Sequence, residues 1–163
     1  MSTGDHDTSI EPVELDGAGH ALLSGLRAIA VGRAECPAVR RMFADLFGRS
    51  GNEALNVLFV FVRQLAFSSK RRLRVHLPGC SAISGDEMIF LSAISAAQCE
   101  GASAERGMGQ WISRLAGRSD VAPTLAHTLK ALGELLSESG CKVTFDQASR
   151  PTESPPLHSR VLH

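Results

Sequence analysis

Residues 53–67, EALNVLFVFVRQLAF, are the most apolar stretch of this chain. On a helical wheel, the polar residues of this region fall within one arc of about 120°, which Val60 and Phe67 interrupt. These polar residues are Asn52, Glu53, Asn56, Arg63 and Gln64. Because the rest of the circumference is apolar, the pattern predicts a helix that contacts other helices on most of its sides. Such a helix is the central element of a bundle.

The same stretch argues against a membrane span. Its uncharged run, ALNVLFVFV at 54–62, is followed directly by Arg63 and Gln64. This run is much shorter than the stretch of about 20 apolar residues that a helix needs to cross a bilayer. We therefore expect no membrane partner.

Helical spacing of apolar residues recurs on both sides of this stretch. Pro37 is suited to the first helical position, Ser84 and Glu87 match a capping box, and Asp120 is placed to cap the last helix. Helices are predicted at 19–34, 37–47, 53–67, 85–99, 105–116 and 121–139. The fold class predicted is therefore mainly α, a compact bundle of five or six helices.

Two segments depart from helical spacing. Apolar and polar residues alternate over 72–77 and again over 141–145, which is the period of a strand. We therefore predict that a short two-stranded β-ribbon, about 71–77 with 141–146, accompanies the helices. Two strands need support from helices to be stable, so this ribbon is an addition to the bundle and not its basis.

Composition indicates one domain with polar ends. Residues 1–17 are predicted to be a disordered acidic arm, 18–146 a single helical domain, and 147–163 a flexible tail. The chain of 163 residues is long enough to bury a core, and its hydrophobic content of 44% is ordinary for a globular protein. The N-terminus carries acids and no apolar leader, so a cytoplasmic location with reduced thiols is expected.

The basic cluster Lys70, Arg71, Arg72 and Arg74 is the candidate nucleic-acid contact. It closes a region, 27–74, that is richer in basic than in acidic residues, and its cations suit phosphate groups. The aromatic content of 5%, with no tyrosine, argues against a base-stacking surface. Nucleic-acid binding is therefore an alternative function, and ordinary solvated arginines explain the same residues.

Three residues suggest a thiol or metal site: Cys36, His76 and Cys80. Thiolate and imidazole are ligands of zinc and iron, although only the His76–Cys80 spacing is local and the chain has no CxxC motif. Cys36 also stands at a predicted helix start, where the thiol pKa is lowered. A thiol- or metal-responsive switch is therefore a second alternative, whereas the prediction for cofactors is none.

Catalytic motifs are missing from the sequence. It contains no GxSxG, no phosphate-binding loop and no GxGxxG after a strand, and first-turn capping explains Asp86 and Glu87. We therefore predict a protein that is not an enzyme. A small interaction or regulatory protein is the expected function, with a protein partner or self-association, including a homodimer.

Two segments carry a resemblance, LRAIAVGRAECPAVRRMF (26–43) and RVHLPGCSAISGDEMIFLSAISAAQ (74–98). Together they resemble a family of small, uncharacterised bacterial proteins in which a Cys-Pro follows the first helix and a capped helix follows a Pro/Cys loop. The resemblance extends over about 20–140. It implies the helical fold and a bacterial, cytosolic origin, and it transfers no activity.

Overall fold

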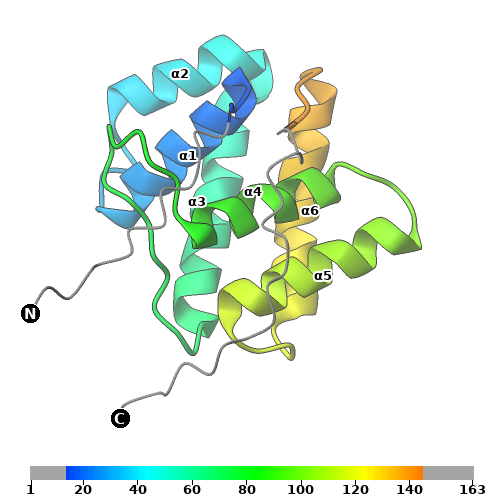
Figure 1. Cartoon of the computed structure of the whole chain (residues 1–163). Coiled ribbons are helices and arrows are strands. Elements are labelled where there is room, and N and C mark those ends of the chain that lie inside the picture. Colours follow the sequence, from blue (N-terminus) through cyan, green and yellow to red (C-terminus); the bar gives the residue numbers. More distant parts are fainter. Residues whose placement is uncertain (1–13, 145–163) are drawn as a thin grey trace, which may run out of the picture.

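The computed structural model describes residues 14–144, and this part of the chain is built from helices (Figure 1). The helices are α1 (Gly17–Ala30), α2 (Pro37–Phe47), α3 (Gly51–Ser68), α4 (Gly85–Ala97), α5 (Ala102–Ala116) and α6 (Ala122–Glu138), with a 3₁₀ turn η1 (Gly48–Ser50) before α3. The predicted mainly α bundle is confirmed. Among these helices, none is both long and apolar enough to span a membrane.

Helix starts follow local chemistry in most cases. Pro37 occupies the first turn of α2, and Ser84 and Glu87 form the predicted capping box of α4. The Asp120 cap is wrong, because α6 begins after Val121 without a side-chain cap and Asp120 pairs instead with Arg118. An aspartate two residues after an arginine reaches the guanidinium more directly than the first amides of α6.

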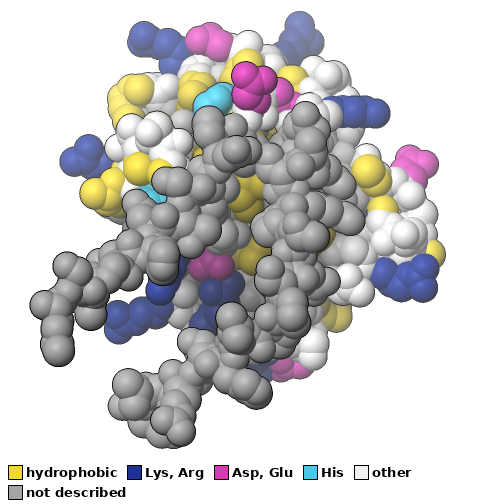
Figure 2. All heavy atoms as spheres, viewed as in Figure 1, with side chains coloured by type: hydrophobic (Ala, Val, Ile, Leu, Met, Phe, Trp, Pro, Cys, Tyr) yellow, Lys and Arg dark blue, Asp and Glu magenta, His cyan; other side chains and the backbone are white. Residues whose placement is uncertain are grey.

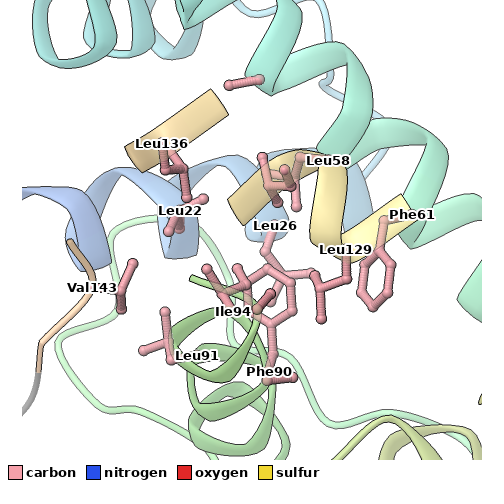
Figure 3. Close-up of a cluster of buried hydrophobic side chains, with 14 of the residues drawn as sticks. Leu22, Leu26, Leu58, Phe61, Phe90, Leu91, Ile94, Leu129, Leu136 and Val143 are labelled. Atoms are coloured by element: carbon pink, nitrogen blue, oxygen red, sulfur yellow. The ribbon is translucent and has the colours of Figure 1, made fainter. Parts of the chain in front are cut away.

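Helix α3 lies at the centre of the packing. It contacts α1, α2 and α6, while α4, α5 and α6 contact one another. In Figure 1, α4 crosses in front of α3, and the rings of Phe61 and Phe90 bring these two helices together with centroids 6.1 Å apart. Figure 3 shows side chains that meet in the core: Leu22, Leu26, Leu58, Phe61, Phe90, Leu91, Ile94, Leu129 and Leu136.

Glycines allow three of the helices to approach closely. A Cβ added to Gly25 of α1 would lie 2.9 Å from Leu58 and Phe43, and one on Gly51 of α3 would lie 2.4 Å from the carbonyl oxygen of Phe43. On α6, a Cβ at Gly133 would lie 2.9 Å from the backbone of Ala97. The packing of the bundle therefore depends on glycines, which leave room for a neighbouring backbone, as well as on leucine and phenylalanine.

The predicted β-ribbon is wrong within the described residues. Residues 71–77 and 141–144 are irregular, and 145–146 lie outside the described part. Side chains supply the hydrogen bonds that a partner strand would make. The Gln98 amide binds Cys141 O and Val143 N at 2.7 and 2.8 Å, and Asp16 accepts from Thr144 N at 2.9 Å.

Helix α1 begins at Gly17, and the residue before it has a structural role. Asp16, assigned from the sequence to the acidic arm, caps α1 by accepting from Gly19 N at 2.7 Å. One carboxylate therefore orders the first helix and the segment after the last one. The predicted arm up to residue 13 and the tail 147–163 lie outside the described residues.

Candidate protein-interaction surface

A buried ion pair organises the segment that carries the sequence-predicted sites. Arg27 of α1 is 6% exposed and Glu87 of α4 is 0% exposed. The guanidinium donates Nε to Glu87 Oε1 at 2.7 Å and Nη2 to Oε2 at 3.0 Å. Its remaining N–H groups reach the carbonyls of Cys80 and Ala82 at 2.6 and 2.7 Å. Arg27 therefore holds both the start of α4 and the loop before it.

Glu87 accepts two further hydrogen bonds from that loop. Its Oε2 accepts from Ser84 N at 2.8 Å, and its Oε1 accepts from His76 N at 3.1 Å. Burial raises the pKa of Glu87, but the bonds from Arg27, Ser84 and His76 together outweigh it and hold the pKa below the ordinary value of 4.5. The carboxylate therefore stays ionised as a structural centre of the loop.

Arg71 forms a second link at the same place. Its guanidinium makes a bidentate pair with Asp86, with distances of 2.7 and 3.1 Å, and its Nε donates to Arg114 O at 3.0 Å. Lys70 N donates to Ala116 O at 2.9 Å, so this segment caps the carboxyl end of α5. Burial raises the pKa of Asp86, but the hydrogen bonds from Arg71 and from Arg74 N lower it by more, so the net pKa is below the ordinary value of 3.8.

The four basic residues predicted to bind nucleic acid thus have different surroundings. All four are exposed, but only Arg71 is held by a carboxylate, that of Asp86. Figure 2 shows acidic and basic side chains lying together over the start of α4. The cluster is therefore partly a structural clamp, and within residues 14–144 its other three cations take part in no ion pair.

The three predicted thiol or metal residues lie in two segments, with Cys36 before α2 and with His76 and Cys80 in the loop before α4. Between residues 14 and 144, no three His, Cys, Asp or Glu side chains form a group that could hold a metal ion, so Cys36, His76 and Cys80 do not meet in one. Cys36 precedes α2, where the amides of Val39 and Ala38 lower its thiol pKa from 9.0; partial burial opposes this and Arg33 adds to it. Cys80 is exposed in the loop.

An exposed face of α3 is the first surface that sequence reasoning missed. Phe59, Val60 and Phe67 are exposed, and Phe67 reaches 81%. The Arg63 guanidinium lies 5.7 Å from the ring centroids of both Phe59 and Phe67. The signal was present in the sequence, because Val60 and Phe67 interrupt the polar arc of this helix.

A groove between α5 and α6 is the second missed surface. Its volume is about 720 Å³. Small residues of both helices line it, Gly109 and Ser113 of α5 with Ala122 and Ala126 of α6. Further lining residues are Glu105, Arg106, Gln110, Arg114, Ser119 and Pro123. The sequence signal was the pair of glycines at 107 and 109, which lie within the continuous helix α5.

Comparisons with known protein families, with curated proteins and with solved structures found no match. The resemblance to a bacterial family and each function inferred from the sequence therefore stay predictions.

Proposed function

We propose that this chain is a non-catalytic interaction protein of the bacterial cytoplasm that self-associates through the exposed face of α3. The observation that carries the proposal is the row formed by Phe59, Arg63 and Phe67, which we call the α3 face. Aromatic residues and arginine are the types most enriched at the centres of protein interfaces. The cytoplasmic location is in keeping with four free cysteines.

Exposure of the α3 face to water costs free energy. Burial of one phenylalanine side chain contributes roughly 1.5–3 kcal/mol, and Phe67 is 81% exposed. Arg63 is held between two rings, so its side chain loses little further freedom when a partner covers it. A protein surface that covers the face therefore gains apolar contact at low ordering cost.

The charges on this face fit a second copy of the chain. Within residues 14–144, neither Glu53 nor Arg63 takes part in an ion pair. They lie ten residues apart on α3, which corresponds to about 15 Å along the axis. Two α3 helices crossing antiparallel would place Glu53 of each copy beside Arg63 of the other. This pairing has the two-fold symmetry of a homodimer.

Sedimentation velocity of the full chain tests the proposal. We expect a dimer for the wild type and a monomer for Phe67→Ser, which removes exposed apolar area without touching the core. Leu77→Ser is the matched control, because Leu77 is also exposed, at 70%, but lies in the loop before α4. A monomeric wild type, or a dimer unaffected by Phe67→Ser, contradicts the proposal.

Nucleic-acid binding is the second candidate function, and one observation favours it. Lys70, Arg72 and Arg74 stay exposed beside the clamp, where phosphate groups could reach them. Salt-dependent retention on DNA that disappears in Arg72→Ala/Arg74→Ala would support this candidate. The thiol- or metal-responsive switch through Cys36 and Cys80 stays a further alternative, and both thiols are free.

A further inference from the structure

We propose that the groove between α5 and α6 binds an acidic, amphipathic helix of a partner protein. The groove and the α3 face are built from different helices, so this inference goes beyond self-association and does not depend on it. Three properties of the groove carry the argument, namely its shape, the polarity of its walls and the charge at its rim.

The shape of the groove suits a helix. Two neighbouring helices line it, and small residues of both contribute, Gly109 and Ser113 of α5 with Ala122 and Ala126 of α6. A Cβ built on Gly109 meets no atom within 4 Å, so the space beside α5 is open. Helix-in-groove recognition uses apolar side chains spaced three or four residues apart, which such a trough accepts.

The rim of the groove is positively charged. Arg106 and Arg114 line it, and in the described part of the chain neither has a carboxylate within ion-pair distance. Glu105, the acid in the lining, is paired with Lys130 at 3.4 Å, so it does not neutralise the arginines. The Arg114 guanidinium lies 5.1 Å from the Trp111 ring centroid, which holds the charge in place. Acidic residues flanking the apolar anchors therefore match the rim.

The walls favour a protein over a nucleic acid. Ala122, Pro123 and Ala126 make the α6 wall of the groove apolar. A nucleic acid would use the arginines through its phosphates and leave these apolar residues without a partner. An acidic amphipathic helix uses both, because its apolar side chains contact the wall and its carboxylates contact the arginines of the rim.

A peptide selection tests this inference. The full-length chain is immobilised and a random library of peptides of about 16 residues, roughly four helical turns, is displayed against it. Enriched peptides are synthesised with a fluorescent label and their affinity is measured by anisotropy. We expect them to carry glutamate or aspartate together with apolar residues at helical spacing.

Two glycine variants locate the binding. Gly109→Leu fills the groove, whereas Gly107→Leu is the matched control, since Gly107 is on the same helix, also has open space at its Cβ, and does not line the groove. We expect Gly109→Leu to weaken binding at least about tenfold and Gly107→Leu to leave it unchanged. Arg106→Glu/Arg114→Glu should weaken it comparably.

Three results would overturn the inference. The first is a selection that enriches no acidic amphipathic peptide, and the second is a selected peptide that binds Gly109→Leu as tightly as the wild type. The third is complete displacement of the peptide by single-stranded DNA, which would assign the rim to nucleic acid. Sedimentation of Gly109→Leu should be unchanged, so failure here is distinguishable from failure of α3 self-association.

Discussion

At the scale of single residues, the Arg27–Glu87 pair is the interaction on which most of the loop before α4 depends. Removing one partner of a buried ion pair leaves an uncompensated charge and typically costs about 3–5 kcal/mol. We expect Arg27→Ala to lower the free energy of unfolding by that amount, because it also frees the carbonyls of Cys80 and Ala82. Urea unfolding followed by the fluorescence of the single tryptophan, Trp111, measures it.

Arg40→Ala is the control for this substitution. Arg40 pairs with Glu35 at the surface, and exposed pairs contribute about 0–1 kcal/mol. The two variants remove the same side chain from helices of the same bundle, so their difference isolates burial. A loss below about 1 kcal/mol in Arg27→Ala would show that the pair does not organise the loop.

The same pair makes stability depend on pH in a defined direction. Glu87 has a folded pKa below its ordinary value of 4.5, so the unfolded chain binds more protons in this range. Its contribution is fully present above pH 4.5 and is lost as the pH falls through the lowered folded value. Asp86 behaves in the same way below 3.8.

We therefore expect the wild-type free energy of unfolding to fall as the pH is lowered from 5 through the acidic range. Urea titrations at several pH values should show that the free energy of unfolding depends less on pH in Glu87→Gln than in the wild type. Asp86→Asn provides a second variant with a smaller effect, because only Arg71 and Arg74 N depend on that carboxylate. If the free energy of unfolding changed equally with pH in all three proteins, Glu87 and Asp86 would not be the groups that cause the dependence.

Sequence reasoning identified half of this pair. Ser84 and Glu87 were recognised as a capping box because their partners lie within one turn. Arg27 was not recognised, because its partner lies 60 residues away and only the crossing of α1 and α4 brings them together. The residue types alone did not distinguish this arginine from the exposed ones.

At the scale of elements, glycines distinguish close helix contacts from open surface. A Cβ on Gly133 meets the backbone of Ala97, which cannot rotate away, whereas a Cβ on Gly107 meets nothing. We expect Gly133→Ala to destabilise the protein by about 1–3 kcal/mol. Gly107→Ala should stabilise it by about 0.5–1 kcal/mol through helix propensity. Thermal unfolding of both variants measures these opposite changes in stability. If both variants were stabilised, or both destabilised, the packing described for these two glycines would be refuted.

The segment 71–77 shows why one element was predicted wrongly. Its alternating pattern holds over 72–75, where Leu73 and Val75 are half-buried and Arg72 and Arg74 are exposed, but it fails at Leu77, which is exposed. The period of two does not specify the hydrogen-bond partner, however. Here Asp86 and Glu87 accept the N–H groups of Arg74 and His76, so carboxylates at a helix start replace a second strand.

At the scale of the whole molecule, the helical bundle could be predicted because period and start signals are local. The apolar stretch 53–67 was placed correctly as a central helix, and most helix limits differ from the predicted ones by a few residues. The α3 face had a signal in the sequence, because Val60 and Phe67 interrupt the polar arc, but the pattern alone does not say which side of an apolar helix stays uncovered. The α5–α6 groove could not be predicted, because it depends on which helices become neighbours: residues of both helices line it.

We propose that two copies of the chain associate through the α3 face in an antiparallel arrangement, and an exchange of charges between Glu53 and Arg63 tests this arrangement. Arg63→Glu should convert the dimer to a monomer, because Glu53 of each copy would then face a glutamate. The double variant Glu53→Arg/Arg63→Glu should restore the dimer, since the two charges have exchanged places.

Sedimentation equilibrium of the wild type, the single variant and the double variant is the measurement we would make. The predicted result is dimer, monomer and dimer, in that order. A monomeric wild type would contradict self-association through the α3 face. A double variant no more associated than Arg63→Glu would contradict the antiparallel pairing of Glu53 with Arg63.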